Sequence, residues 1–319
     1  VALRGCIYIL MEGDQMKLET HITPKTITAI YEHYIESRKN GHRPHLGGSQ
    51  IGHHCDRALW YQFRHAWSPS FPGRILRLFE TGDLEEIRIV RNLRDVGVEV
   101  WEIDPETKKQ INFTDHGGHF GLSLDGIGKG FQESKVPHVL EFKTANTKSF
   151  KKMKAEGLEK ANPQYWSQVQ IGMHYAGLTR AFFFMTCKET DDIHGERVHY
   201  DKAAALKLVA RAEHVIFTNT PPAKIAETDD WWQCKFCDYR FVCQRGAIPE
   251  VNCRTCAHST PEKEGGWSCA VDGGNSVCKL HLFRPDMMPG EVVDAGDDWV
   301  EYDDGIRNQG NSLELFEND

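Results

Sequence analysis

Charged residues lie inside two short apolar segments that otherwise have the composition of buried β-strands. The first segment, residues 119–126, carries Asp125, and the second, residues 138–144, carries Glu141 and Lys143. Burial of an uncompensated charge is strongly unfavourable. A divalent cation bound by both carboxylates, with Lys143 beside a phosphate group, would balance these charges. Such a group would suit metal-dependent phosphodiester hydrolysis.

The spacing of these residues adds to the prediction. Glu141 and Lys143 are two positions apart, so on a strand both side chains leave from the same face. Lys143 is then placed to orient or deprotonate an attacking water, or to bind the phosphate. A Glu-x-Lys pattern alone is a weak signal, but the apolar neighbours of this one strengthen it. The predicted metal site comprises Asp125, Glu141 and Phe142, with Mg²⁺ or Mn²⁺ as the ion.

The hydrophobic pattern predicts a mixed α/β domain. Helices are expected at 24–39, 49–61 and 74–95, followed by strands at 98–103, 111–115, 120–127 and 139–144. A basic helix at 147–156, a helix from Pro163 to Tyr175, strands at 180–188 and 197–200 and a helix at 201–217 follow. This order predicts a mixed sheet with helices on its faces. The lysines of the basic helix form either a solvated face or a phosphate-contacting surface.

The cysteines divide into two groups. Seven of the ten cysteines lie between positions 234 and 278, and close spacings without a recognisable secretory signal indicate metal ligands rather than disulfides. The first group, Cys234, Cys237 and Cys243, offers three thiolates, and Cys55 is the candidate fourth ligand. Spacing leaves zinc and an iron–sulfur cluster equally open for this group, and a buried unligated thiol remains the alternative for Cys55.

The second group favours a structural zinc ion in a small ribbon. It consists of Cys253, Cys256, Cys269 and Cys278, with His281 as a spare imidazole. The two remaining cysteines, Cys6 and Cys187, match neither spacing and are expected to be unligated.

The charge distribution is uneven. The net charge is −8, yet residues 291–319 hold ten acidic residues and one basic residue, so the rest is nearly neutral. We expect an acidic tail that either is disordered and solubilising or competes for a nucleic-acid groove. No apolar segment approaches the ~18 residues of a membrane span. We therefore expect a cytoplasmic protein without a membrane partner.

Taken together, the charged motif resembles the PD-(D/E)XK nuclease motif. Gly82-x-x-x-Glu86 is similar to the first motif of the lambda-exonuclease and YqaJ group, although RecB-like proteins have a histidine there. The segment with Gln168 and Gln170 resembles that group's glutamine motif, with His174 where an aromatic residue is usual. These two glutamines are about 200° apart on a helix, so only one can face the site, and we choose Gln170.

The cysteines carry a second resemblance. Cys55-x-Arg57-x3-Tyr61, together with the 234–243 cysteines, looks like the iron–sulfur signature of RecB-like nucleases, including CRISPR-associated exonucleases and AddB. The resemblance covers roughly residues 45–245. It implies a restriction-endonuclease-like sheet flanked by helices and a [4Fe–4S] cluster on the four cysteines. The implied catalytic residues are Asp125, Glu141, Lys143, Glu86 and Gln170.

The resulting expectation has four regions and one leading function. The regions are an N-terminal extension at 1–22, a nuclease domain at 23–245, a zinc module at 246–288 and the acidic tail at 289–319. The function is a metal-dependent exonuclease acting on DNA ends or single strands in phage-type recombination, repair or replication in a bacterial host. A recombination or single-strand-binding protein is the expected partner. The alternative is a metal-stapled nucleic-acid-binding or assembly protein with a vestigial nuclease site.

Overall fold

The computed structural model describes residues 24–38, 42–271, 278–310 and 312–315, with side chains as far as residue 310. The chain divides into two compact units, Val1–Lys39 with Phe71–Leu78 and Asn40–Ser70 with Phe79–Asp319. In the first unit, α1 (Lys25–Ser37) packs against the start of α3 (Gly73–Asp95). A Cβ atom at position 73 would lie 2.1 Å from the carbonyl oxygen of Tyr31, so this contact requires Gly73.

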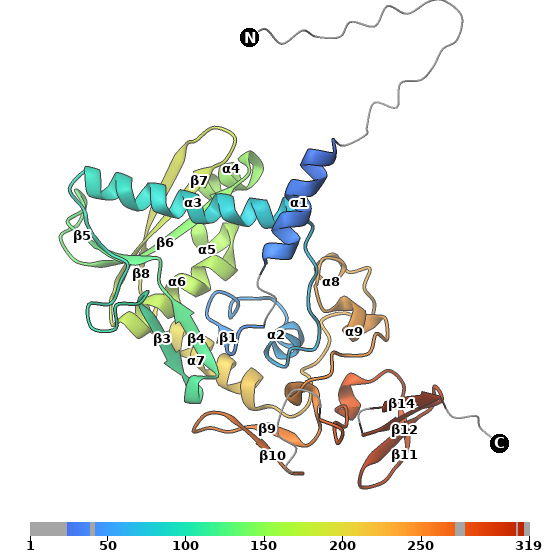
Figure 1. Cartoon of the computed structure of the whole chain (residues 1–319). Coiled ribbons are helices and arrows are strands. Elements are labelled where there is room, and N and C mark those ends of the chain that lie inside the picture. Colours follow the sequence, from blue (N-terminus) through green and yellow to red (C-terminus); the bar gives the residue numbers. More distant parts are fainter. Residues whose placement is uncertain (1–23, 39–41, 272–277, 311, 316–319) are drawn as a thin grey trace, which may run out of the picture. The chain divides into compact units, whose positions relative to one another are not determined.

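The second unit is built on a five-stranded mixed sheet (Figure 1). The strand order is β2 (Glu99–Trp101), β5 (Gly126–Lys129), β6 (His138–Ala145), β7 (Arg180–Cys187) and β8 (Ile193–His199). Only β6 and β7 are parallel; the other three pairs are antiparallel. The connection from β6 to β7 contains α4 (Thr147–Glu156), α5 (Leu158–Ala161) and α6 (Pro163–Ala176), and α7 (Lys202–Phe217) follows β8.

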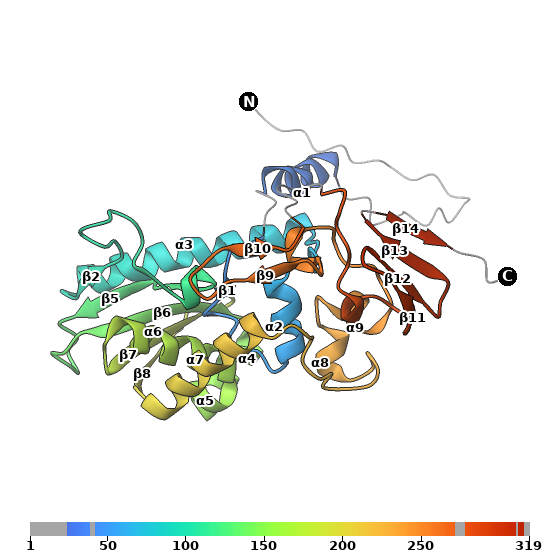
Figure 2. The same cartoon turned by 90° about the horizontal axis from the view of Figure 1, so that it is seen from below.

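Strand β6 is buried on both faces, which explains its nearly continuous apolar sequence. On one face, Leu140 and Phe142 belong to a cluster with Ile89 and Val90 of α3. On the other face, Val139 packs in the main core with the apolar residues of α6 and α7. Figure 2 shows the strands between α3 and these helices. The expected mixed sheet with helices on its faces is therefore present.

Three expected elements differ in the structure. The strand expected at 197–200 begins four residues earlier, as β8 (Ile193–His199). The expected strand at 120–127 is divided between β4 (Phe120–Ser123), which pairs with β1 (Leu46–Gly47) and β3 (Asn112–Asp115), and β5 of the central sheet. A short 3₁₀ helix, His116–Gly118, precedes β4. The expected helix at 49–61 begins only at Asp56, as α2 (Asp56–Phe63), and Cys55 is its N-cap. Residues 48–54 form turns and bends, and Gly52 among them lies directly against α6.

The C-terminal part contains small antiparallel elements. Helices α8 (Trp232–Lys235) and α9 (Arg240–Gln244) come first, followed by the 3₁₀ turn Cys253–Thr255, the hairpin β9 (Ser259–Pro261)–β10 (Trp267–Cys269) and the 3₁₀ turn Pro285–Met287. The acidic segment forms a four-stranded antiparallel sheet, with strands β11 (Val292–Ala295), β12 (Trp299–Tyr302), β13 (Ile306–Gln309) and β14 (Ser312–Leu315).

In the described residues, the acidic segment therefore forms a sheet rather than the expected disordered tail. Val300 and Tyr302 bury their side chains against Leu282, Phe283 and Met288, so apolar packing holds the acidic segment in place. Within the described part of the chain, no helix combines the length and the apolar character needed to cross a membrane.

The contact between Gly52 and α6 yields a stability prediction. A Cβ atom at position 52 would lie 2.7 Å from both the Gln164 Cα and the Ser167 Cβ. We expect Gly52→Ala to lower the free energy of unfolding by about 1–3 kcal/mol through overpacking. The matched control is Gly82→Ala in α3, where a Cβ would meet nothing within 4 Å. There we expect a gain of about 0.5–1 kcal/mol. Urea denaturation of both variants checks this, and equal effects would contradict the packing described.

Candidate functional site

Charged side chains gather where β5 and β6 meet. Gly126 pairs with Leu140, and the next position along the ladder sets Asp125 beside Glu141. Asp125 Oδ2 accepts a hydrogen bond from the backbone N–H of Phe142 at 2.8 Å. The Lys143 ammonium contacts the Glu141 carboxylate. The sheet register thus brings Asp125, Glu141 and Lys143 together, as the sequence predicted.

The burial of this group affects its ionisation. Glu141 is 2% exposed. Burial raises the pKa of Glu141 to about 8, with Lys143 opposing the rise and Asp125 adding to it. Burial also raises the pKa of Asp125, against the effects of Lys143 and the Phe142 N–H. Burial alone would lower the pKa of Lys143, but the charges of Glu141 and Asp125 hold it above its ordinary value.

Helix α3 contributes a third carboxylate. Burial, followed by the charge of Asp125, raises the pKa of Glu86 to about 7, and Lys143 opposes this rise. The neighbouring Glu85 is engaged elsewhere: it forms an ion pair with Arg88 at 2.7 Å and accepts a hydrogen bond from Thr186 Oγ1 at 2.8 Å. Of the two glutamates, the structure therefore brings Glu86 to the group.

The donor set fits an oxygen-liganded divalent ion. Three carboxylates share one ammonium, and a nearby cation would favour their ionised forms. Such hard oxygen ligands suit Mg²⁺ or Mn²⁺. In the described residues, however, no three histidine, cysteine, aspartate or glutamate side chains lie close enough to hold a single ion. Phe142, included in the predicted metal site, uses its N–H for Asp125, so only its carbonyl could be a ligand.

The structure does not bring Gln170 into this group. The Gln170 side chain is fully buried; its Nε2 donates to the His199 carbonyl at 2.9 Å, and its Oε1 accepts from the Asp201 N–H at 2.8 Å. Its contacts therefore join α6 to the β8–α7 connection. The opposite face of α6 carries Tyr165, whose ring centre lies 5.4 Å from the Lys143 Nζ. Gln168 is three residues from Tyr165 and so shares its side of the helix.

Sequence reasoning missed this distinction although a signal was present. Gln170 lies within the run Val169–Met173, all of which is buried, whereas Gln168 is half-buried. Every residue of this run is buried, and a glutamine inside it is more apt to satisfy buried backbone groups than to face a substrate.

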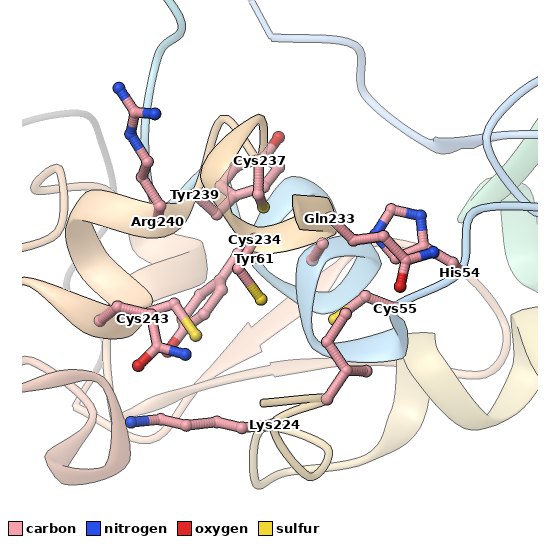
Figure 3. A pocket seen from close by; sticks show the side chains of 13 residues that line it. His54, Cys55, Tyr61, Lys224, Gln233, Cys234, Cys237, Tyr239, Arg240 and Cys243 are labelled. Carbon is pink, nitrogen blue, oxygen red and sulfur yellow. The ribbon is translucent and has the colours of Figure 1, made fainter. Parts of the chain in front are cut away.

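The first cysteine group surrounds a pocket (Figure 3). Cys55 precedes α2, Cys234 lies in α8, Cys237 follows α8 and Cys243 lies in α9. All four line one pocket with about 370 Å³ of empty space, part of which is open to solvent. Burial raises the pKa of Cys237 to about 11, and the nearby Cys55 and Cys243 add to the rise.

Burial and nearby charges also act on two other thiols of this pocket. Burial is also the main cause that raises the pKa values of Cys234 and Cys243. Cationic Arg57 and Lys224 act in the opposite direction on Cys243. Four cysteines are ligands for either zinc or iron–sulfur clusters.

The second cysteine group lies around the β9–β10 hairpin. Cys253 and Cys256 flank a 3₁₀ turn, Cys269 ends β10, and Cys278 is the first described residue after position 271. Cys256 is buried, whereas Cys253 and Cys269 are exposed. The spare histidine, His281, is buried and its Nε2 lies 3.2 Å from Thr255 Oγ1.

Two other cysteines were expected to be unligated. Cys187 is buried at the end of β7, where its Sγ lies near Thr147 Oγ1 and Glu189 rather than either cysteine group. Cys6 lies outside the described residues.

Comparisons with known proteins give structural neighbours only. No protein-family model matches the sequence, and the search of curated proteins gives no match. The crystal structure of SSO0001 has a TM-score of 0.42 at 14% identity, covering 70% of this chain and 98% of that one. An alkaline exonuclease from Laribacter hongkongensis, LHK-Exo, has a TM-score of 0.38 at 17% identity, covering 58% of this chain and 90% of its own.

The same exonuclease in complex with dAMP has a TM-score of 0.37 at 15% identity, covering 59% of this chain and 90% of its own. At such identities and TM-scores, these likenesses do not assign a function to this chain. Its chemistry has to be inferred from the charged group and the cysteines.

The carboxylate group yields a binding prediction. We expect Asp125→Asn and Glu86→Gln each to weaken Mn²⁺ binding at least ~10-fold, because each removes a charged oxygen ligand. Glu85→Gln is the matched control and should leave Mn²⁺ binding unchanged, since Glu85 pairs with Arg88. Mn²⁺ titration followed by electron paramagnetic resonance measures all three. A loss in the Glu85 variant equal to that in the Glu86 variant would contradict the assignment.

Proposed function

We propose that this chain is a metal-dependent DNA exonuclease of the PD-(D/E)XK type, with a restriction-endonuclease-like core. The observation that carries the proposal is the convergence of Asp125, Glu141 and Lys143 at the β5–β6 junction, with Glu86 reaching the same group from α3. To stay ionised around one lysine, three buried carboxylates need a compensating positive charge, which a bound divalent ion would supply.

Each residue has a distinct role in this proposal. Asp125, Glu141 and Glu86 hold the divalent ion, Mg²⁺ or Mn²⁺, which when bound neutralises charge on the phosphate and activates a water. Lys143 presents an ammonium group on the same strand face, between Glu141 and the ring of Tyr165. There it binds a phosphate oxygen of the substrate. Gln168, rather than Gln170, is placed to hold the attacking water.

Surface features support DNA as the substrate. Helix α4 begins two residues after β6 ends, so its exposed Lys148, Lys151 and Lys154 follow directly from the strand of the charged group. Lysines in such a position suit contact with a phosphate backbone. Near the cysteine pocket, Trp232 is 62% exposed and Phe236 is 80% exposed. Exposed aromatic rings stack on unpaired bases, which favours single strands or frayed ends.

The cysteine pocket completes the proposed core. Cys55, Cys234, Cys237 and Cys243 bind a [4Fe–4S] cluster that joins the start of α2 to α8 and α9. Its role is structural, because it fixes chain segments almost 180 residues apart. The setting is phage-type recombination, repair or replication, with a recombination or single-strand-binding protein as partner.

One observation favours a second candidate. In the described residues, the carboxylates are gathered but do not lie close enough to enclose one ion. Such an arrangement is expected of a nucleic-acid-binding or assembly protein whose nuclease site is vestigial. The two candidates differ in a direct assay, because only the first cleaves DNA.

The nuclease proposal predicts a loss of cleavage in one lysine variant. End-labelled single- and double-stranded DNA is incubated with Mg²⁺ or Mn²⁺ and the wild-type chain or Lys143→Ala. We expect the substitution to slow hydrolysis at least ~100-fold, because a charge next to the phosphate is lost. The control, Lys129→Ala at the exposed end of β5, should retain the wild-type rate. DNA binding without hydrolysis by the wild type would support the second candidate instead.

The cluster proposal is tested separately. Protein purified without oxygen should contain iron and sulfide and show broad visible absorbance. Cys243→Ala should lose both, because it removes one of four ligands. Cys187→Ala, a buried thiol outside the pocket, should keep them. A colourless wild-type protein with zinc in place of iron would overturn the cluster.

A further inference from the structure

Two buried arginines and one half-buried arginine lie beside the second cysteine group, and none of them forms an ion pair with a carboxylate. Arg64 is 0% exposed, Arg284 is 9% exposed and Arg254 is half-buried. Burial, together with the charges of Arg284 and Arg254, lowers the pKa of Arg64 to about 9. Among the described residues, no carboxylate forms an ion pair with any of the three guanidinium groups.

Backbone carbonyls satisfy part of this cluster. Arg64 donates to the carbonyls of Arg254 and Thr218 at 3.3 and 3.0 Å. Arg284 donates to the carbonyls of Cys256 and Asn219 at 3.4 and 2.8 Å. The Nε atoms of both side chains have no hydrogen-bond partner. Carbonyl contacts supply acceptors but no formal negative charge, and the nearby carboxylate of Asp286 acts on Arg284. The charges of Arg64 and Arg254 are therefore left uncompensated.

Arg254 belongs to the same cluster. It lies in the turn between the first two cysteines of the group, and its guanidinium donates to the Phe63 carbonyl at 2.8 Å. The guanidiniums of Arg64 and Arg254 lie 5.6 and 5.1 Å from the ring centre of Trp267, two residues before Cys269. The buried positive charge therefore adjoins the cysteines themselves.

The local fold brings these cysteines to one end of the hairpin. The Cys256 N–H bonds the Cys253 carbonyl at 3.2 Å, forming a tight turn. Cys269 pairs with Ser259 across the hairpin. The chain after Cys278 returns to this turn, because Cys256 pairs with Phe283. Cys253, Cys256 and Cys269 thus lie near enough for the charges of the other two to act on Cys256, and the segment that follows Cys278 joins the same turn.

We propose that Cys253, Cys256, Cys269 and Cys278 bind one zinc ion as thiolates, and that this centre is the counter-charge of Arg64, Arg254 and Arg284. Four thiols release four protons on binding, and four thiolates with one divalent ion sum to two negative charges. In the described residues the thiols do not yet converge on one ion. The side chains of Cys253 and Cys269 are exposed, so neither is locked in the core.

This inference is independent of the nuclease proposal and has a structural consequence. Arg64 follows α2 directly, and the Phe63 carbonyl at the end of α2 binds Arg254. The zinc centre therefore fixes the C-terminal module to the helix that begins after Cys55, through charge as well as packing.

The first test is metal content. The full chain should carry one zinc ion that Cys256→Ser loses and that Cys187→Ser retains. Substitution of Co²⁺ for zinc should give the absorption bands of a tetrahedral thiolate site. Zinc content unchanged by Cys256→Ser would overturn the site.

The second test addresses the charge coupling. Zinc affinity is measured by competition with a chromophoric chelator for the wild type, Arg64→Met and Arg64→Lys. We expect Arg64→Met to weaken zinc binding about 10-fold, within the range for groups next to a metal centre. Arg64→Lys, which keeps the charge, should weaken binding less. Arg307→Met, which breaks the ion pair with Glu301, is the control and should leave zinc affinity unchanged.

If Arg64→Met does not fold, Arg254→Met serves in its place, because Arg254 is only half-buried. Equal zinc affinities for the wild type and the methionine variant would overturn the counter-charge role. An equal loss for Arg64→Met and Arg64→Lys would do the same, because it would indicate packing rather than charge.

Discussion

The burial of Glu141 and Lys143 on β6 is the constraint around which the second unit is organised. This strand lies between two apolar clusters, so its charged side chains have no route to bulk water except along the sheet surface. Within the sheet, Glu141 contacts Lys143, and Asp125 lies beside Glu141 on the neighbouring strand β5. Helix α3 adds Glu86, which makes the group more negative and a cation ligand more favourable.

A charge imbalance of the opposite sign lies at the second cysteine group. Arg64, Arg254 and Arg284 lie together, and backbone carbonyls supply hydrogen-bond acceptors, while the one carboxylate that acts on the cluster in the described residues, Asp286, acts on Arg284. Both regions follow the same rule, because an interior does not retain unbalanced charge at low cost. An excess of carboxylates calls for a hard cation, and an excess of guanidinium groups calls for an anionic centre such as a zinc tetrathiolate.

Sequence patterns predicted most of the fold because most elements are set locally. Helix α4 occupies the predicted residues, and α1, α3, α6 and α7 begin and end within about two residues of expectation. The predicted elements differ from the structure where tertiary contacts determine the local conformation. Residues 48–54 form turns where Gly52 packs against α6, and the strand through Asp125 divides because its two halves join different sheets. Helical spacing predicts that Gln168 and Gln170 face opposite sides of α6. It does not predict which of the two faces the core. The arginine cluster had no sequence signal, because Arg64 and Arg254 are 190 positions apart.

The central claim is that Asp125, Glu141 and Glu86 hold a divalent ion beside Lys143. Crystals of the full chain grown with Mn²⁺ and measured by anomalous diffraction test it most directly. We predict an anomalous peak bonded to the carboxylates of Asp125 and Glu141, with Lys143 displaced from its contact with Glu141. The absence of a peak at saturating Mn²⁺, with Lys143 still bound to Glu141, would contradict the account.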